Sequence, residues 1–94
     1  MPEIHTSFQD NARKCYTVHI GEIDLFFSYE TLIGVHLVTE KMRIKNEWGP
    51  TTGRHINQLG IEDFPIAYPY EMEEAVYTKL QEIGIKTINK RMNP

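Results

Sequence analysis

The sequence has little of what disulfide-rich, membrane-spanning or nucleic-acid-coating proteins need. Its 94 residues include a single cysteine, Cys15, which excludes an internal disulfide and is typical of a reducing compartment. No apolar run approaches the roughly 18–20 residues that span a bilayer, and the first residues lack the basic and apolar regions of a signal peptide. Thirteen acidic residues outweigh ten basic ones, for a net charge of −3, whereas nucleic-acid-coating domains are usually basic. We therefore expect a soluble, cytoplasmic protein without a membrane partner.

The residues that are present suffice for one small core. The chain is 40% hydrophobic, 11% aromatic and 24% charged, which is a globular rather than a disordered composition. It contains no internal repeat and no linker. These features predict a single domain over residues 1–94, with 1–12 as a loosely ordered lead-in and 85–94 as a tail.

Alternating apolar and polar residues predict four β-strands joined by short turns. The predicted strands cover residues 13–20, 23–28, 31–38 and 42–48. Gly21-Glu22 and Glu40-Lys41 are the predicted turns between the first and the last pair. Because parallel neighbours need long crossovers, the short connections indicate an antiparallel meander.

The rest of the chain predicts two helices. Gly49-Pro50 ends the strands, and Thr51 or Thr52 can cap a short helix over about 52–59, which Gly60 stops. A loop over 61–69 follows. A longer C-terminal helix then carries apolar residues at helical spacing and closes at Gly84; these are Met72, Ala75, Val76, Leu80 and Ile83. The expected fold class is α+β, a four-stranded antiparallel sheet with the short helix and the longer C-terminal helix on one face.

Three apolar residues of the central strands raise the question of an interface. Phe26, Leu32 and Val38 are expected on the sheet face that the outer strands leave polar, for example at Cys15 and Thr17. Either a helix or the N-terminal arm covers this face, or a second copy of the chain does. The second reading predicts a homodimer.

The most polar cluster surrounds the start of the short helix. Thr51, Thr52, Arg54, His55 and Asn57 could form an anion pocket, since helix N–H groups and an arginine fork attract negative charge. The alternative is purely structural. In that reading a threonine caps the helix, Arg54 is solvated and His55 bonds back to the strand that ends at Trp48.

Charged residues gather in two places. Lys41, Arg43 and Lys45 alternate along one strand and could contact DNA or RNA, or could protect an edge strand from aggregation. Residues 62–74 contain five acids and no base. Such a polarised molecule could steer a charged partner.

No combination of residues predicts an enzyme, a cofactor or a metal site. Cys15 and His19 are four residues apart on one strand, hence more than about 10 Å, and His36 could join only one of them. Zinc normally needs four ligands in tight pairs. Ser28 lies at a strand end without a nucleophile-elbow sequence, and Cys15 has no identifiable base.

Two motifs of this sequence resemble those of a known group of proteins. The first is Ser28-Tyr29-Glu30-Thr31, and the second, which follows Trp48, is Thr51-Thr52-Gly53-Arg54-His55-Ile56-Asn57. Over roughly residues 23–60 the chain resembles short, uncharacterised proteins of phages and other mobile elements that share a Ser-Tyr-x-Thr … Thr-Thr-x-Arg-His-x-Asn pattern. Members often have Ser where this chain has Gly49-Pro50. The resemblance implies an accessory protein that binds and blocks a host protein, such as a defence protein.

Together these observations favour a non-enzymatic protein-binding module that acts in the host cytoplasm. Two alternatives remain open from the sequence. One is a nucleic-acid-associated protein that uses Lys41, Arg43, Lys45 and Arg54, and the other is a nucleotide- or anion-binding protein with its pocket at 51–57.

Overall fold

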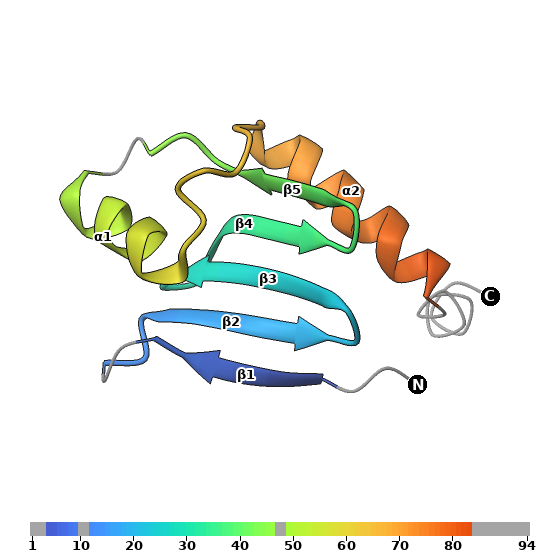
Figure 1. Cartoon of the computed structure of the whole chain (residues 1–94), viewed down its shortest axis with the longest axis horizontal. Coiled ribbons are helices and arrows are strands. Elements are labelled where there is room, and N and C mark those ends of the chain that lie inside the picture. Colours follow the sequence, from blue (N-terminus) through green and yellow to red (C-terminus); the bar gives the residue numbers. More distant parts are fainter. Residues whose placement is uncertain (1–3, 10–11, 47–48, 84–94) are drawn as a thin grey trace.

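The computed structural model describes residues 4–9, 12–46 and 49–83 (Figure 1). In chain order its elements are β1 (Ile4–Phe8), β2 (Cys15–Ile20), β3 (Ile23–Ser28), β4 (Thr31–Leu37), β5 (Glu40–Arg43), α1 (Pro50–Leu59) and α2 (Pro69–Glu82). The strands form one antiparallel sheet in sequence order. The predicted α+β class and antiparallel meander are confirmed, with five strands in place of four.

The additional strand is β1, so the prediction of a loose lead-in is wrong for residues 4–8. In β1, Ile4 pairs with Ile20 and Phe8 pairs with Tyr16. Five residues are too few to show a convincing period on their own, and strand formation depends on the neighbouring strand against which they pack. The lead-in residues 1–3 and 10–11, Trp48, Gly84 and the predicted tail lie outside the described residues.

The turn before β5 lies two residues earlier than predicted. Leu37 pairs with Glu40, so Val38 and Thr39 form the turn and β5 covers Glu40–Arg43. Val38 has a φ of 63°, a left-handed conformation that β-branched residues rarely adopt. The position of this turn was mispredicted because Val38-Thr39 contains neither glycine nor asparagine, the residues that most readily adopt a positive φ in turns.

Val38→Gly is expected to raise the free energy of unfolding by about 1 kcal/mol, because glycine adopts a positive φ without steric cost. For a domain of this size that corresponds to a melting temperature about 4–8 °C higher, measurable by circular dichroism. Thr39→Gly is the matched control, since Thr39 is not among the described residues with a positive φ and should lose stability. An unchanged or lower melting temperature in Val38→Gly would show that the turn is not strained.

A β-bulge at Ile33 reverses the facing of the strand β4. Phe26 pairs with Gly34 while Phe27 pairs with Leu32, so Ile33 is the extra residue. Leu32 and Gly34 therefore lie on opposite faces of the sheet, although they are two residues apart.

The two helices cover opposite faces of the sheet, which corrects the prediction of a single covered face. His55 of α1 contacts Cys15 and Ser28, which pair with each other on one face. Helix α2 lies over the other face, where it packs near Leu37 and Met42. The face under α1 is called the first face below, and the face under α2 the second face.

The chain changes faces by passing beside β5. The Arg43 N–H donates to the Pro65 carbonyl (2.9 Å), and the Ala67 N–H donates to the Arg43 carbonyl (2.8 Å). These bonds hold the segment between the helices alongside the sheet edge (Figure 1). The hydrophobic periodicity of the two helices does not indicate that they pack on opposite faces of the sheet.

At β2, the side chains on the first face are more deeply buried than those on the second face. Cys15 and Thr17 are 0% and 4% exposed beneath α1, whereas Tyr16, Val18 and Ile20 on the second face are only half-buried. The expectation of a polar, wet face at Cys15 and Thr17 is therefore wrong. Both residues are small enough to let a helix approach the sheet closely, which a polarity pattern does not reveal.

The short helix starts differently from the prediction and ends as predicted. Its N-cap is Gly49, with a φ of 99° and no side-chain cap, so neither Thr51 nor Thr52 caps it. Gly60, with a φ of 72°, closes it in the left-handed conformation. Helix α2 begins at Pro69, where proline's missing N–H costs nothing.

Candidate functional site

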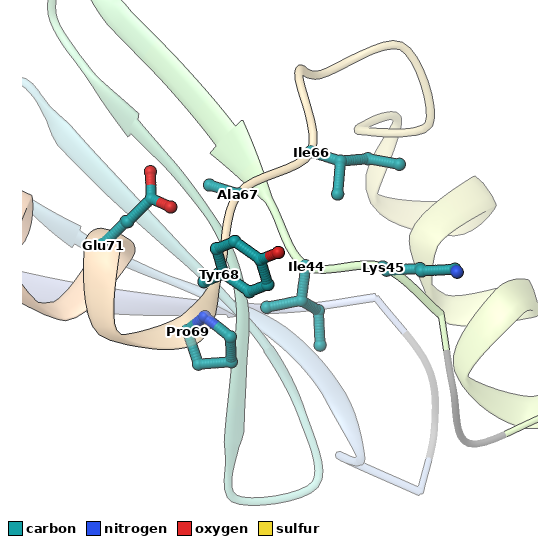
Figure 2. Close-up of a pocket in the computed structure, with 7 residues that line it drawn as sticks. All are labelled: Ile44, Lys45, Ile66, Ala67, Tyr68, Pro69 and Glu71. Carbon is teal, nitrogen blue, oxygen red and sulfur yellow. The ribbon is translucent and has the colours of Figure 1, made fainter.

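A pocket of about 400 Å³ lies between the end of β5 and the start of α2. It is lined by Ile44, Lys45, Ile66, Ala67, Tyr68, Pro69 and Glu71. Figure 2 shows Ile44, Tyr68 and Pro69 in the middle of the group, with Lys45 at one end and Glu71 at the other. The pocket therefore has an apolar centre and one charge of each sign at its ends. We call it the Tyr68 pocket.

Two prolines and the edge of β5 give the pocket its shape. Pro65 and Pro69 frame the segment, and a residue before proline is held in an extended conformation, as Tyr68 is at φ −74° and ψ 150°. The two hydrogen bonds to Arg43 fix this extended segment beside the sheet. Ile44, only 2% exposed, belongs to the core and gives the pocket a rigid base.

Large apolar side chains stand exposed around the Tyr68 pocket. Ile66 is 59% exposed, Tyr68 66% and Tyr70 65%, and the rings of Tyr68 and Tyr70 stack with centroids 5.7 Å apart. Stacking restricts both rings, so less side-chain freedom remains to be lost on binding. Tyrosines that surround a pocket are typical of protein-binding surfaces.

The segment that lines the pocket belongs to an acidic part of the sequence, residues 62–74. Five exposed carboxylates lie in this segment of the sequence or within a few residues of it; they are Glu62, Asp63, Glu71, Glu73 and Glu74. Glu71 lies in the first turn of α2, where the helix dipole favours negative charge. Of the predicted acidic region, Glu71 lines the pocket, and Lys45 is the cation on its lining.

A second, smaller pocket lies at the start of α1. Its volume is about 260 Å³, and Ser28, Tyr29, Thr31, Ile33, Thr51 and Thr52 line it. The two motifs that carry the resemblance are therefore brought together in space. Of the five residues predicted to bind an anion, only Thr51 and Thr52 line this pocket, while Arg54 and Asn57 are exposed elsewhere on the helix.

His55 links α1 to the sheet through Ser28 and Tyr29, two residues that line this pocket. Its Nδ1 lies 2.6 Å from Ser28 Oγ, the Cys15 thiol lies 3.8 Å from its carbonyl oxygen, and the Tyr29 ring tilts against it at 5.8 Å. The expected bond to the strand ending at Trp48 is replaced by this bond to β3. At 4% exposure, His55 is buried and joins α1 to β3, and anion binding at this helix stays a prediction.

The three predicted interface residues do not share a face. Phe26 is 8% exposed and packs edge-on against Phe64 on the first face. The bulge turns Leu32 to the second face, where it pairs with Phe27. Val38 lies in the β4–β5 turn. The expectation of one apolar face formed by this set is wrong because the alternation breaks at the bulge.

The predicted basic patch is divided. Arg43 donates from Nε to the Glu62 carbonyl (3.2 Å) and from Nη1 to the Ile44 carbonyl (2.9 Å), so two of its donors are occupied. The Lys41 ammonium lies 5.7 Å from the Phe64 ring centroid, while Lys45 lines the Tyr68 pocket. β5 ends at Arg43, so the three cations do not form one strand face.

A chain of polar contacts on the first face was not expected from the sequence. His19 Nε2 lies 3.1 Å from Ser7 Oγ, and His19 Nδ1 lies 2.7 Å from Asp24 Oδ1. His5 stacks on His19, and His36 Nδ1 is 4.0 Å from Asp24. This order of groups is that of a serine–histidine–aspartate triad, but neither Ser7 nor His19 lines any of the four best-formed pockets in the described part of the chain.

Among residues 4–9, 12–46 and 49–83, no group of three or more His, Cys, Asp or Glu side chains is arranged to hold a metal ion. Neither helix in these ranges is long and apolar enough to cross a membrane.

The residues around the Tyr68 pocket were missed by sequence reasoning, which treated 61–69 only as a loop. A signal was present, because Ile66 and Tyr68 between two prolines, and Tyr70 just after them, are large apolar residues in an otherwise acidic segment. Loops rarely need such residues unless they pack or bind.

Comparison with known proteins gives one match. A family model described as a family of unknown function (DUF8033) matches residues 3–67. The match takes in all five strands, α1 and the crossing segment up to Ala67. No curated protein and no solved structure matches the chain.

Proposed function

Because this chain belongs to DUF8033, a family of unknown function, we propose its function from its own surface: a non-enzymatic module that binds another protein. The observation that carries the proposal is the Tyr68 pocket, an apolar hollow surrounded by exposed Ile66, Tyr68 and Tyr70. Binding energy at protein interfaces concentrates where a large side chain of one partner fills a desolvated pocket of the other. A pocket of about 400 Å³ accommodates one such side chain.

The charge around the pocket defines the partner further. Glu71 lines it, and four more exposed carboxylates lie within a few residues of its lining segment in the sequence; they are Glu62, Asp63, Glu73 and Glu74. A complementary surface carries lysine or arginine around an apolar anchor residue, since complementary charge speeds association and rejects acidic competitors. We therefore propose a basic protein surface with a projecting apolar or aromatic side chain as the partner.

The sequence resemblance supports a biological setting for this binding. The Ser28–Thr31 and Thr51–Asn57 motifs resemble those of short phage and mobile-element proteins. In that setting the chain acts in the host cytoplasm and inhibits a host protein, such as a defence protein, by occupying one of its surfaces. Inhibition by occupancy requires no catalytic group on this chain.

The test is capture of a protein from host lysate by the tagged chain, repeated with variants of the pocket. Ile66→Asp places a charge on an exposed position of the pocket and should weaken capture at least about tenfold, or about 1.4 kcal/mol. Tyr77→Ala is the matched control, because Tyr77 is 56% exposed on α2 and does not line the pocket. Capture by the parent should also weaken as salt rises, because the charges on this surface are exposed.

Three outcomes contradict the proposal. A partner retained equally by Ile66→Asp and the parent would place binding elsewhere. Nuclease-sensitive capture with no stoichiometric protein would favour the nucleic-acid alternative, for which Lys41→Ala should reduce binding. An empty capture from every relevant lysate would leave the protein-binding function without support.

A further inference from the structure

The two edges of the sheet differ in how they are covered. At one edge, the segment Pro65–Ala67 lies alongside β5 and bonds to Arg43. At the other edge, β1 pairs with β2 on its inner side, and within the described residues no segment pairs with its outer side. An uncovered edge presents a row of backbone donors and acceptors to any other strand.

The backbone groups on the outer side of β1 can be assigned. The Gln9 N–H donates to the Cys15 carbonyl (2.7 Å), so the N–H and carbonyl of Gln9 face β2. Successive residues of a strand direct these groups to opposite sides. Ser7 and His5 therefore also face β2, and Ile4, Thr6 and Phe8 present their N–H and carbonyl groups outward.

The side chains of β1 offer none of the usual protection of an edge. The strand reads Ile-His-Thr-Ser-Phe, without proline and without a lysine, arginine, aspartate or glutamate. Ile4 is 58% exposed and Phe8 is 48% exposed. Natural edge strands avoid pairing by carrying charge, proline or bulges, and β1 carries neither of the first two.

The strand is also complementary to itself. In an antiparallel pair centred on Thr6, Ile4 lies opposite Phe8 of a second copy, and Phe8 opposite its Ile4. Each outward N–H then meets an outward carbonyl, because Ile4, Thr6 and Phe8 are the residues that pair. On the first face the same register sets His5 opposite Ser7, so apolar meets apolar and polar meets polar.

We propose that two copies of this chain associate through the outer edges of β1, about a two-fold axis at Thr6, to form one continuous antiparallel sheet. A two-fold interface requires a surface that complements itself, which the alternation of β1 provides.

The second face strengthens the proposal. Phe8, Tyr16, Phe27 and Leu32 form one cross-strand row there, with the Phe8 and Tyr16 ring centroids 5.6 Å apart and those of Tyr16 and Phe27 5.1 Å apart. The row ends at the β1 edge with a half-exposed Phe8. Pairing would continue it onto Ile4 of the second copy, which pairs with Ile20 in its own sheet.

The first experiment measures the mass of the full chain by sedimentation equilibrium from micromolar to millimolar concentration. We expect a dimer that dissociates on dilution. Thr6→Pro removes one outward N–H without disturbing the bonds to β2, as proline is tolerated at such edge positions, and should weaken dimerisation at least tenfold. Thr6→Val keeps the N–H and the strand preference and should remain dimeric. Circular dichroism must show both variants folded.

The second experiment tests the register by oxidation. Thr6→Cys places a thiol on the two-fold axis, opposite its own copy, and should form a covalent dimer that reducing agent reverses. Ile4→Cys, on the same edge, is the control. Its thiol faces Phe8 and lies more than about 10 Å from its own copy, so it should not cross-link.

A parent that is monomeric at every concentration would overturn the proposal, as would a dimer that persists unchanged in folded Thr6→Pro. Cross-linking of Ile4→Cys but not of Thr6→Cys would overturn the register. None of these three results bears on the Tyr68 pocket, which lies at the opposite edge of the sheet beyond β5. Failure of the dimer and failure of the proposed binding function are therefore distinguishable.

Discussion

Gly34→Ala is expected to lower the free energy of unfolding by about 1–2 kcal/mol. Overpacking of the core destabilises the folded state, and the smaller conformational entropy of the unfolded alanine chain offsets only part of that loss. A Cβ at this position of β4 would lie 2.7 Å from Ile61 Cδ1 and 3.3 Å from the Met42 carbonyl oxygen. Gly34 is buried and Ile61 is 1% exposed, so neither side of the contact can move freely. Urea or thermal unfolding measures the loss.

Ile61→Val tests whether this contact is the cause. The substitution removes Cδ1, the atom that a Cβ at position 34 would meet, and by itself should cost about 0.5–1.5 kcal/mol. In the double variant Gly34→Ala/Ile61→Val the clash is absent. Its loss of unfolding free energy should therefore be smaller, by about 1 kcal/mol, than the sum of the losses in the two single variants. Strictly additive losses would show that the strain arises elsewhere, for example at the Met42 carbonyl.

Ser28→Ala should cost about 1–3 kcal/mol of unfolding free energy. The hydroxyl lies 2.6 Å from His55 Nδ1, and both residues are buried, at 3% and 4% exposure. Without the hydroxyl the imidazole nitrogen keeps its desolvation penalty and loses its partner, and water has little access to replace it. Because this bond ties α1 to β3, the loss should appear as a lower melting temperature by circular dichroism.

Ser7→Ala is the matched control for Ser28→Ala. Ser7 Oγ also bonds to a histidine, at 3.1 Å from His19 Nε2, but His19 is 26% exposed and water can take the place of the hydroxyl. We expect a loss within about 0.5 kcal/mol, because both residues are only half-buried. Equal losses in the two variants would mean that burial does not set the strength of the Ser28–His55 bond.

Much of the local structure followed from the sequence alone. The alternation of β2 and β3 and the turn at Gly21 were predicted because period and turn chemistry act within a few residues. The stop of α1 at Gly60 was predicted for the same reason. The α+β class and the antiparallel order followed from short connections, and the acidic region at 62–74 is a property of composition.

The tertiary structure decided which residues act together. The sequence could not show that Pro65–Ala67 runs beside β5, carries α2 to the second face and creates the Tyr68 pocket, because those bonds join backbone groups far apart in the chain. Nor could it show β1, whose pairing depends on β2, or the bulge at Ile33, which separates Leu32 from Phe26. In each case a long-range backbone contact sets the outcome, whereas a sequence pattern reports only what a residue prefers among its neighbours along the chain.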